Sequence, residues 1–321
     1  MPEIGMDLNR FILEEERKFP SATGSLSIAL TSLETSVKII ASHVRMAGLA
    51  EIFGKAQKTN IQGEEVQKLD EFSNNVLVRV LSDSGQFYAI ASEELDDVIY
   101  PEKGKDGKYI IAFDPLDGST NIEVNISIGT IFSIYKRDKG SEADFLCGGS
   151  LQIASGYAMY GSSSVFVYTT GMGLNGFTLD PSSGLFLLSH PGMRIPESGK
   201  TYSFNESNSQ GWDDKMRSYL ETLKSSGYTQ RFIGTMVADV HRTLLKGGIF
   251  AYPADKKSTK GKLRVLYEVF PMCMMVEEAG GLAVDAAGKR ILDIVPTEIH
   301  QRTPVFLGSR KEIEIFLNTT G

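Results

Sequence analysis

The feature that most constrains this chain is an apolar run that ends in two closely spaced aspartates. Residues 110–113 (Ile-Ile-Ala-Phe) are the β-branched and aromatic residues typical of a buried strand, and Asp114-Pro115-Leu116-Asp117 follow them. Proline lacks an N–H and cannot continue a hydrogen-bonded ladder, so the strand is predicted to end at Asp114. The three-residue spacing then allows a tight turn to direct both carboxylates toward one point.

The next four residues, Gly118-Ser119-Thr120-Asn121, favour the start of a helix. Residues of this kind cap helices, and the first turn of a helix presents free backbone N–H groups. Two carboxylates beside such N–H groups form a place where a divalent cation and a phosphate can meet. The alternative is an Asp-Pro turn closed by an Asx-Gly turn with no ligand. The whole string, placed after a hydrophobic strand, favours the metal–phosphate interpretation.

Length and charge exclude several classes of protein. A chain of 321 residues suggests two domains or one large α/β body. With 33 Lys and Arg against 40 Asp and Glu, the net charge of −7 gives no general reason to bind nucleic acid or an anionic membrane. The N-terminal residues lack a signal-peptide pattern, and no apolar run is long enough to span a bilayer, so we expect a cytoplasmic protein. Cys147 and Cys273 are isolated, which favours two packed, reduced thiols.

Hydrophobic periodicity predicts an alternation of helices and strands. Helices are expected over residues 7–19, 26–47, 65–82, 213–226, 237–246, 264–279 and 311–317. Strands are expected over residues 87–92, 110–114, 126–135, 165–169, 176–179, 185–188, 201–204, 248–252 and 305–307. Residues 50–64 lose the helical period and are predicted to form a mobile loop, although an ordinary connector fits equally. The Pro- and Gly-rich segment 190–199 is the best candidate for a domain boundary.

Acidic residues recur at the ends of these predicted elements. Glu93-Glu94 follow the strand 87–92, repeating the plan of Asp114 and Asp117, although such acids are often only a solvated surface patch. Asp70 lies early in its helix, where a carboxylate could be purely structural. The recurring set is Glu64, Asp70, Glu93, Glu94, Asp114, Asp117 and Glu268. Oxygen ligands without nearby His or Cys suit Mg²⁺ or Mn²⁺ rather than zinc, and such cations commonly act on phosphates.

Basic residues are concentrated in the second half of the chain, which suits the anionic end of a substrate distant from the metals. They are Arg231, Lys256, Lys257, Lys260, Lys262 and Arg264. The alternative for Lys256-Lys257 is a solvated turn. Neither a P-loop nor a Gly-x-Ser-x-Gly elbow is present, and His43 and His241 lie on amphipathic helices where a structural role is expected.

The string Asp114-Pro115-Leu116-Asp117-Gly118-Ser119-Thr120-Asn121 resembles the motif of the lithium-sensitive, magnesium-dependent phosphatase superfamily. Further segments spread over the whole chain narrow the resemblance to class I fructose-1,6-bisphosphatases. These segments are residues 63–70, 91–94, 127–132, 236–244, 262–268 and 296–302.

The resemblance implies a fold, an assembly and a reaction. It implies an α/β protein of layered α/β/α/β/α architecture, with an N-terminal domain over residues 1–195 and a C-terminal sugar-phosphate-binding domain over 196–321. It further implies a cytoplasmic homotetramer that hydrolyses the 1-phosphate of fructose 1,6-bisphosphate to fructose 6-phosphate in gluconeogenesis. Two to three Mg²⁺ ions per subunit, with Mn²⁺ as a substitute, would activate the attacking water.

The resemblance also assigns roles to single residues of this sequence. The metals would be held by Glu93, Asp114, Asp117, Glu268 and the Leu116 carbonyl. Asp70 and Glu94 would orient and deprotonate the attacking water, and the backbone N–H groups of Gly118 and Ser119 would bind the departing phosphate. The sugar and the 6-phosphate would be held by Asn205, Tyr252, Lys262 and, from the neighbouring subunit, Arg231. An inhibitory AMP site would comprise Thr23, Gly24, Ser27, Lys108, Tyr109 and Lys136.

The chain departs from the family pattern at several positions. Phe232 stands where many relatives have Tyr, and residues 207–209 lack a Tyr that is common there, so contacts to the 6-phosphate are expected to be fewer. Glu64 occupies a position that is Asp in animal enzymes. Ser25 replaces Glu, and Lys136 replaces Arg, at the AMP site, so AMP inhibition is expected to be weakened.

The sequence is also compatible with two rival functions. The first is sedoheptulose-1,7-bisphosphatase activity, alone or in addition to activity on fructose 1,6-bisphosphate. The second is a catalytically silent sensor that binds AMP or another metabolite, and the complete set of acidic residues argues against it.

Overall fold

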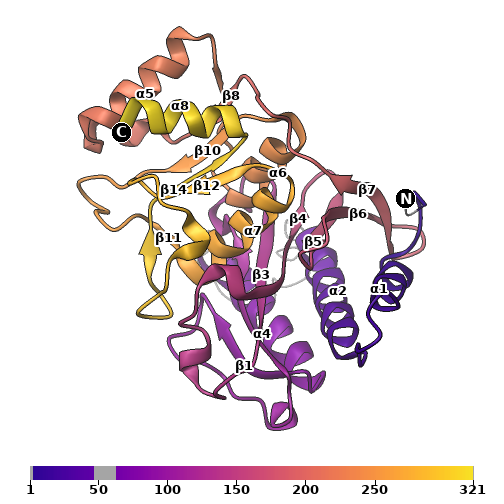
Figure 1. Cartoon of the computed structure of the whole chain (residues 1–321). Coiled ribbons are helices and arrows are strands. Elements are labelled where there is room, and N and C mark those ends of the chain that lie inside the picture. Colours follow the sequence, from indigo (N-terminus) through magenta and orange to yellow (C-terminus); the bar gives the residue numbers. More distant parts are fainter. Residues whose placement is uncertain (1–2, 47–62, 321) are drawn as a thin grey trace.

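A seven-stranded sheet forms the centre of the computed structural model, which describes residues 3–46 and 63–320 (Figure 1). Its strands follow one another in chain order, and β1 and β2 are parallel while every later pair is antiparallel. The strands are β1 Phe87–Ser92, β2 Tyr109–Asp117, β3 Ile128–Lys136, β4 Gln152–Tyr160, β5 Ser164–Thr169, β6 Leu174–Asp180 and β7 Leu185–Met193. The predicted strands over residues 176–179 and 185–188 are confirmed as parts of β6 and β7, which pair as a hairpin.

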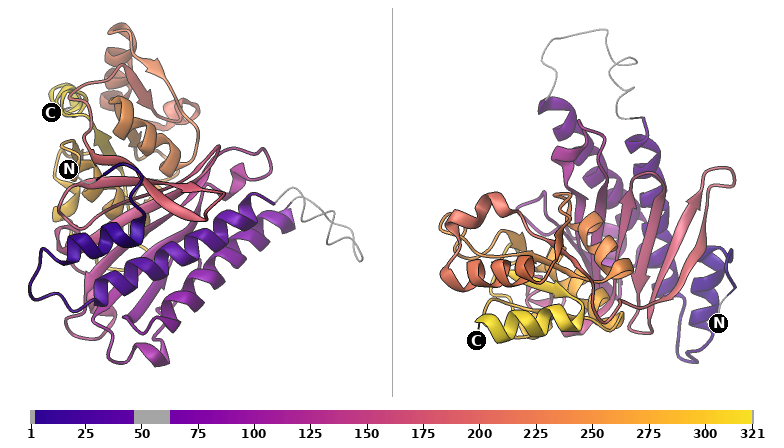
Figure 2. Two further views of the ribbon diagram at one scale, coloured as in Figure 1. Left: turned by 90° about the vertical axis from the view of Figure 1, so that its right-hand side faces the viewer. Right: turned by 90° about the horizontal axis from the view of Figure 1, so that it is seen from above.

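Helices from the N-terminal part of the chain cover one face of this sheet (Figure 2). They are α1 Leu8–Glu16, α2 Ser25–Val44 and α4 Gly63–Asp83. The apolar stripe of α2 explains its position, because Leu30, Leu33, Val37 and Ile40 are buried against alternate residues of the sheet such as Phe132. This packing forms one hydrophobic core.

The opposite face of the seven-stranded sheet packs against two further helices and a π-helical turn. They are α6 Met236–Lys246, the π turn Val265–Val269 and α7 Phe270–Glu278. A five-stranded sheet covers these in turn, with the order β12 Leu282–Val284, β14 Val305–Gly308, β10 Ile249–Tyr252, β8 Thr201–Ser203 and β9 Thr229–Gln230. One continuous core joins both sheets through α6 and α7. Pro271 lies in the first turn of α7, where a missing N–H is harmless.

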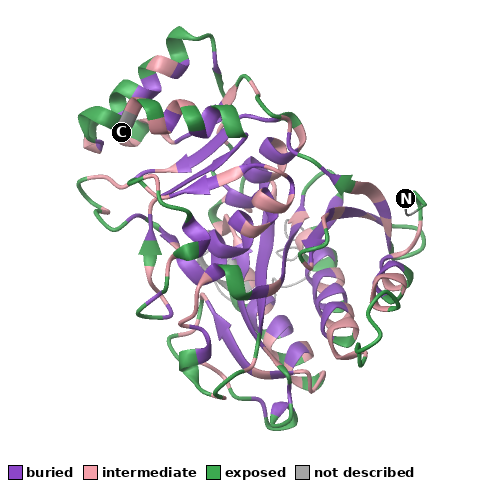
Figure 3. Ribbon diagram, viewed as in Figure 1, coloured by how far each residue is buried: buried purple, intermediate pink, exposed green. Residues whose placement is uncertain are grey.

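The outermost layer consists of α5 Asp214–Ser225 and α8 Arg310–Thr320, which form a third core with β8 and β14. The strand β11 Leu263–Arg264 directly precedes the π turn and pairs with β13 Arg302–Thr303 in a short antiparallel ribbon. Figure 3 shows that both sheets and the inner helices are buried, whereas α5 and α8 expose their outer sides. The layers alternate as helix, sheet, helix, sheet, helix, which confirms the predicted fold class.

Two local predictions were wrong. The strand does not end at Asp114: β2 continues to Asp117, with a register shift against β3 between the two aspartates. A bulge of this kind tolerates Pro115, whose carbonyl accepts a hydrogen bond from Thr130 Oγ1 at 2.8 Å. Residues 119–121 form a single 3₁₀ turn rather than the start of an α-helix.

The strand β4 was not predicted at all. Its sequence is poor in β-branched residues and carries Gly156 at its middle, which usually weakens a strand. The structure gives the reason for that glycine, because a Cβ there would lie 2.5 Å from the Phe132 ring on β3. The missing side chain makes room for an aromatic ring of the core.

The structure also bears on the predictions for the cysteines, for membrane spans and for the loop 50–64. Cys147 and Cys273 are free cysteines, and Cys273 is fully buried. Within residues 3–46 and 63–320, none of the helices has the length and apolar character that crossing a membrane requires. Residues 50–62 of the predicted loop lie outside the described residues, and residues 63 and 64 belong to α4. The Glu64 side chain is also outside the described part of the chain.

Candidate active site

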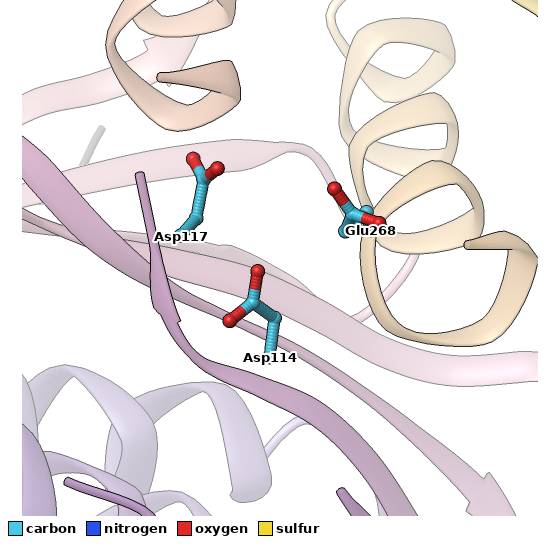
Figure 4. A group of neighbouring side chains, drawn as sticks. All are labelled: Asp114, Asp117 and Glu268. Carbon is cyan, nitrogen blue, oxygen red and sulfur yellow. The ribbon is translucent and has the colours of Figure 1, made fainter. Parts of the chain in front are cut away.

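Three carboxylates from two distant segments of the chain point toward one another at the carboxyl end of β2 (Figure 4). Asp114 and Asp117 lie on β2, and Glu268 lies on the π turn that precedes α7. One oxygen of each lies within 4.8 Å of the others. We call Asp114, Asp117 and Glu268 the acidic cluster.

The backbone around the acidic cluster donates a hydrogen bond to each carboxylate. Asp114 Oδ1 accepts the Leu116 N–H at 2.9 Å, inside the β2 bulge. Asp117 Oδ2 accepts the Val237 N–H at 2.7 Å, at the start of α6, where N–H groups are not used by the helix itself. Glu268 Oε2 accepts the Arg264 N–H at 2.6 Å, across the π turn. Because each group keeps further acceptor sites, all three can bind a cation.

The electrostatics of the acidic cluster favour a bound cation. Burial and the repulsion of neighbouring carboxylates raise the pKa of Asp114 and of Glu268 well above their usual values. Burial also raises the pKa of Asp117 to about 7, although two backbone N–H groups oppose the shift. A divalent cation with oxygen ligands would remove this repulsion, and carboxylate oxygens are the ligands that Mg²⁺ prefers. The donor set therefore fits the expected metal.

Glu93 lies beside the acidic cluster and is connected to it through Asp114 and Arg264. The charge of Glu93 is one of the causes that raise the pKa of Asp114, since the two carboxyl groups lie close together. The Arg264 guanidinium lies 3.3 Å from Glu93 Oε1 and also donates to the Glu93 carbonyl. Leu116, the fifth predicted metal ligand, is buried between the two aspartates.

The two residues predicted to act on water, Asp70 and Glu94, lie close enough to Glu93 for its charge to affect both. Burial is the main cause that raises the pKa of Asp70 to about 7; the charges of Glu94 and Glu93 add to the shift, and a hydrogen bond with the Ser119 side chain opposes it. The pKa of Glu94 is also raised, by burial first and by Glu93 second. A carboxylate with a pKa near 7 is suited to accept a proton at neutral pH.

The predicted phosphate cradle, Gly118 and Ser119, begins the 3₁₀ turn directly after Asp117. Gly118 has φ of 77°, and a Cβ there would collide with Thr235. Thr235 Oγ1 accepts a hydrogen bond from Asn121 Nδ2 at 2.6 Å, which fixes the turn against the start of α6. The cradle is therefore built from β2 and α6 together.

Residues predicted to bind the sugar phosphate gather near the ends of adjacent strands. Asn205 follows β8 and Tyr252 ends β10, and these strands are parallel neighbours, so both residues lie at one sheet edge. Lys262 Nζ lies 5.5 Å from the centre of the Tyr252 ring. Arg231 is exposed, and its side chain donates to the Gln230 carbonyl at 3.2 Å.

Most of the residues predicted to bind AMP line a cavity of about 260 Å³ on the other side of the seven-stranded sheet. Thr23, Gly24, Ser27 and Tyr109 contribute to its wall. Lys108 Nζ donates to Thr23 Oγ1 at 2.8 Å, and Lys136 is paired with Tyr109 between β2 and β3. The structure thus brings all six residues to one region.

The role of Arg264 differs from the prediction. The sequence placed Arg264 among the basic residues of a substrate pocket, whereas the structure places it against Glu93 and Glu268. The only sequence signal for the contact between Arg264 and Glu268 was their spacing of four residues, which is too common to be informative. Thr235, which contacts the turn at Gly118, was not identified from the sequence. Lys256 and Lys257 are exposed next to a turn capped by Asp255, which favours the solvated-turn alternative.

Comparison with known proteins supports the geometry. Residues 6–191 match the family described as Fructose-1-6-bisphosphatase, N-terminal domain, and residues 195–320 match the corresponding C-terminal domain. The chain is 64% identical over 316 residues to a class 1 fructose-1,6-bisphosphatase of a Sulfurihydrogenibium species, covering 98% of this chain and 97% of that protein. It is 51% identical over 317 residues to the cytosolic fructose-1,6-bisphosphatase of Arabidopsis thaliana, covering 96% and 93%.

A solved structure extends the agreement to the fold. The holo form of Leishmania major fructose-1,6-bisphosphatase superposes with a TM-score of 0.90 at 39% sequence identity, covering 98% of this chain and 99% of that one. The acidic cluster, the whole-length match and the shared fold agree with one another. The chain belongs to the class 1 fructose-1,6-bisphosphatase family.

Proposed function

We propose that this fructose-1,6-bisphosphatase removes the 1-phosphate by attack of a water held at the acidic cluster, giving fructose 6-phosphate and phosphate. The observation that carries the proposal is the convergence of Asp114, Asp117 and Glu268 in a chain of this family. Mg²⁺, or Mn²⁺ in its place, at two to three sites per subunit would neutralise phosphate charge and lower the pKa of the water. Those sites would comprise the acidic cluster, Glu93 and the Leu116 carbonyl.

The chain's own residues supply the remaining steps. Asp70 accepts the proton of the attacking water, since its pKa near 7 keeps part of it ionised at neutral pH. Glu94 orients the same water. The N–H groups of Gly118 and Ser119 hold the departing phosphate, since both precede the first hydrogen bond of the 3₁₀ turn, from Asn121 N–H to the Gly118 carbonyl.

The sugar end of the substrate is bound by the second half of the chain. Asn205 and Tyr252 hold the sugar at the shared edge of β8 and β10, and Lys262 beside Tyr252 binds the 6-phosphate. We further propose a homotetramer in the cytoplasm, in which Arg231 reaches the 6-phosphate of a neighbouring subunit. The two domains are proposed to meet between residues 195 and 196, after β7 and before β8.

Product analysis tests the proposed reaction. With Mg²⁺ present, we expect fructose 6-phosphate to accumulate from fructose 1,6-bisphosphate in step with released phosphate. Fructose 1-phosphate as the product would show that the substrate binds in the reverse orientation. Sedoheptulose 1,7-bisphosphate serves as the comparison, and equal kcat/KM for both substrates would favour the dual activity.

The cavity at Thr23 and Tyr109 supports a second proposal, that AMP inhibits the enzyme from a distant site. Lys108 lies at its rim and offers an ammonium group to a phosphate. We expect AMP to inhibit turnover and Lys108→Ala to raise the concentration for half-inhibition about tenfold or more, since hydrogen bonds to charged groups are strong. The matched control is Lys105→Ala, which removes an exposed lysine three residues away. An enzyme that keeps full activity in saturating AMP would refute this second proposal.

A further inference from the structure

Asp239 is a fully buried aspartate that the proposed reaction does not use. It lies in the first turn of α6, and its carboxylate accepts hydrogen bonds from backbone N–H groups that precede the helix. The Ile233 N–H lies 3.1 Å from Oδ1 and 3.0 Å from Oδ2, and the Gly234 N–H lies 3.1 Å from Oδ2. A buried carboxylate is costly unless it is satisfied in this way, so its position requires an explanation.

The hydrogen bonds of Asp239 fix the loop that follows Arg231. The Arg231 N–H donates to the Tyr202 carbonyl of β8 at 2.9 Å, which anchors the beginning of this loop. Asp239 anchors its end, two and three residues later. Gly234 is held at φ of 90°, so the loop has a defined and unusual backbone conformation. The exposed Arg231 side chain is thus carried by a backbone that is fixed on both sides.

Arg242 completes the arrangement from the next turn of α6. One of its nitrogens lies 3.4 Å from Asp239 Oδ1, and another donates to Ser203 Oγ on β8. The positive charge offsets part of the cost of burying Asp239. Burial nevertheless raises the pKa of Asp239 to about 6, so the bonded carboxylate is present at the neutral pH of an assay. Asp239 and Arg242 therefore connect α6, β8 and the Arg231 loop.

We propose that Asp239 is a positioning residue for substrate specificity, which holds the Arg231 loop so that the enzyme prefers a sugar with a second phosphate. The inference rests on the proposed role of Arg231 at the 6-phosphate. Asp239 hydrogen-bonds to backbone N–H groups and pairs with Arg242 rather than with the acidic cluster, and it acts on Asp117 only through its charge. Its loss is therefore expected to weaken binding of the phosphate-bearing sugar end more than the reaction at the acidic cluster.

The test compares kcat/KM for fructose 1,6-bisphosphate and for fructose 1-phosphate, which lacks the 6-phosphate. Asp239→Asn replaces one acceptor oxygen by an NH₂ group that opposes a backbone N–H. We expect kcat/KM for fructose 1,6-bisphosphate divided by that for fructose 1-phosphate to fall about tenfold or more. The reason is that a backbone N–H of residue 233 or 234 loses its hydrogen bond to the charged Asp239 carboxylate. Turnover of fructose 1-phosphate is retained and serves as the measure of folding. Equal losses on both substrates would show a general structural role and overturn the inference.

Further variants separate this inference from the function on which it rests. Arg231→Ala lowers the same ratio, and the double variant Asp239→Asn/Arg231→Ala shows no additional loss, because both changes act through Arg231. Asp213→Asn, which alters the helix N-cap of α5, leaves the ratio unchanged. A lower ratio in Arg231→Ala but not in Asp239→Asn refutes the inference alone, whereas an unchanged ratio in Arg231→Ala refutes the proposed 6-phosphate contact. If Asp239→Asn does not fold, Arg242→Lys replaces it in the test. This variant is expected to lower the ratio by a smaller factor than Arg231→Ala, and an unchanged ratio would refute the inference.

Discussion

Asp117→Asn is expected to reduce kcat on fructose 1,6-bisphosphate by about a thousandfold or more while the protein stays folded. The amide keeps an oxygen that accepts the Val237 N–H, so the start of α6 is preserved. It removes one negative charge from the acidic cluster, and a cation that polarises a phosphate contributes several kcal/mol to a reaction of this type. Phosphate release at saturating Mg²⁺ measures the loss.

The same variant is expected to be more stable than the wild type when no metal is present. The pKa of Asp117 is about 7 in the folded protein and near its usual value in the unfolded chain. The folded state therefore binds the proton more tightly, and the stability from this group is lost as pH rises from the usual Asp pKa of 3.8 to the folded pKa of about 7, with no further change above it. At pH 8 without metal, Asp117→Asn removes a buried negative charge and is expected to raise Tm. Mg²⁺ is expected to raise the Tm of the wild type and not that of Asp117→Asn.

A matched control and a contradicting outcome complete this prediction. Asp214→Asn makes the same chemical change at a side chain that is 97% exposed, and it should alter neither kcat nor the effect of Mg²⁺. A kcat near that of the wild type in Asp117→Asn would show that Asp117 is not a metal ligand.

Asp70→Asn is expected to lower kcat by about 10²- to 10⁴-fold, the usual contribution of a general base. Unlike Asp117, Asp70 lies outside the acidic cluster, and Ser119 and Glu94 are among its neighbours. The variant should therefore keep the rise in Tm that Mg²⁺ causes in the wild type. The combination of lost turnover and retained metal binding distinguishes a base from a ligand.

The pH profile supplies an independent test of Asp70. A base with a pKa of about 7 makes wild-type kcat/KM rise with pH up to that value, and bound cations shift the rise to lower pH by favouring the carboxylate. Asp70→Asn should show a flatter profile over the same range. An unchanged rise in the variant would assign it to another group and remove Asp70 from the proposed role.

Much of the fold could be predicted because the pattern of apolar residues was strong. The stripe of α2 and the apolar run of β1 identified their elements, and Glu93-Glu94 follow β1 as expected. The acids Asp114, Asp117 and Glu268 were selected from the sequence as possible metal ligands, and the structure brings their carboxylates together.

What the sequence could not predict depends on contacts between distant segments. The β2 bulge allows the strand to pass Pro115, and it is stabilised by Thr130 from β3. Gly156 in β4 is understood only beside the Phe132 ring. Arg264 was assigned to a substrate pocket because its charge suggested phosphate, whereas its partner Glu93 lies 171 residues away in the chain.

The most direct measurement is the Mg²⁺ dependence of phosphate release from fructose 1,6-bisphosphate by the unmodified chain. After treatment with EDTA, we expect no release above background. Titration with Mg²⁺ should then restore turnover over the same concentrations that raise Tm, since binding to the folded state stabilises it. Full turnover in EDTA, or a rise in Tm without any turnover, would contradict metal-dependent catalysis at the acidic cluster.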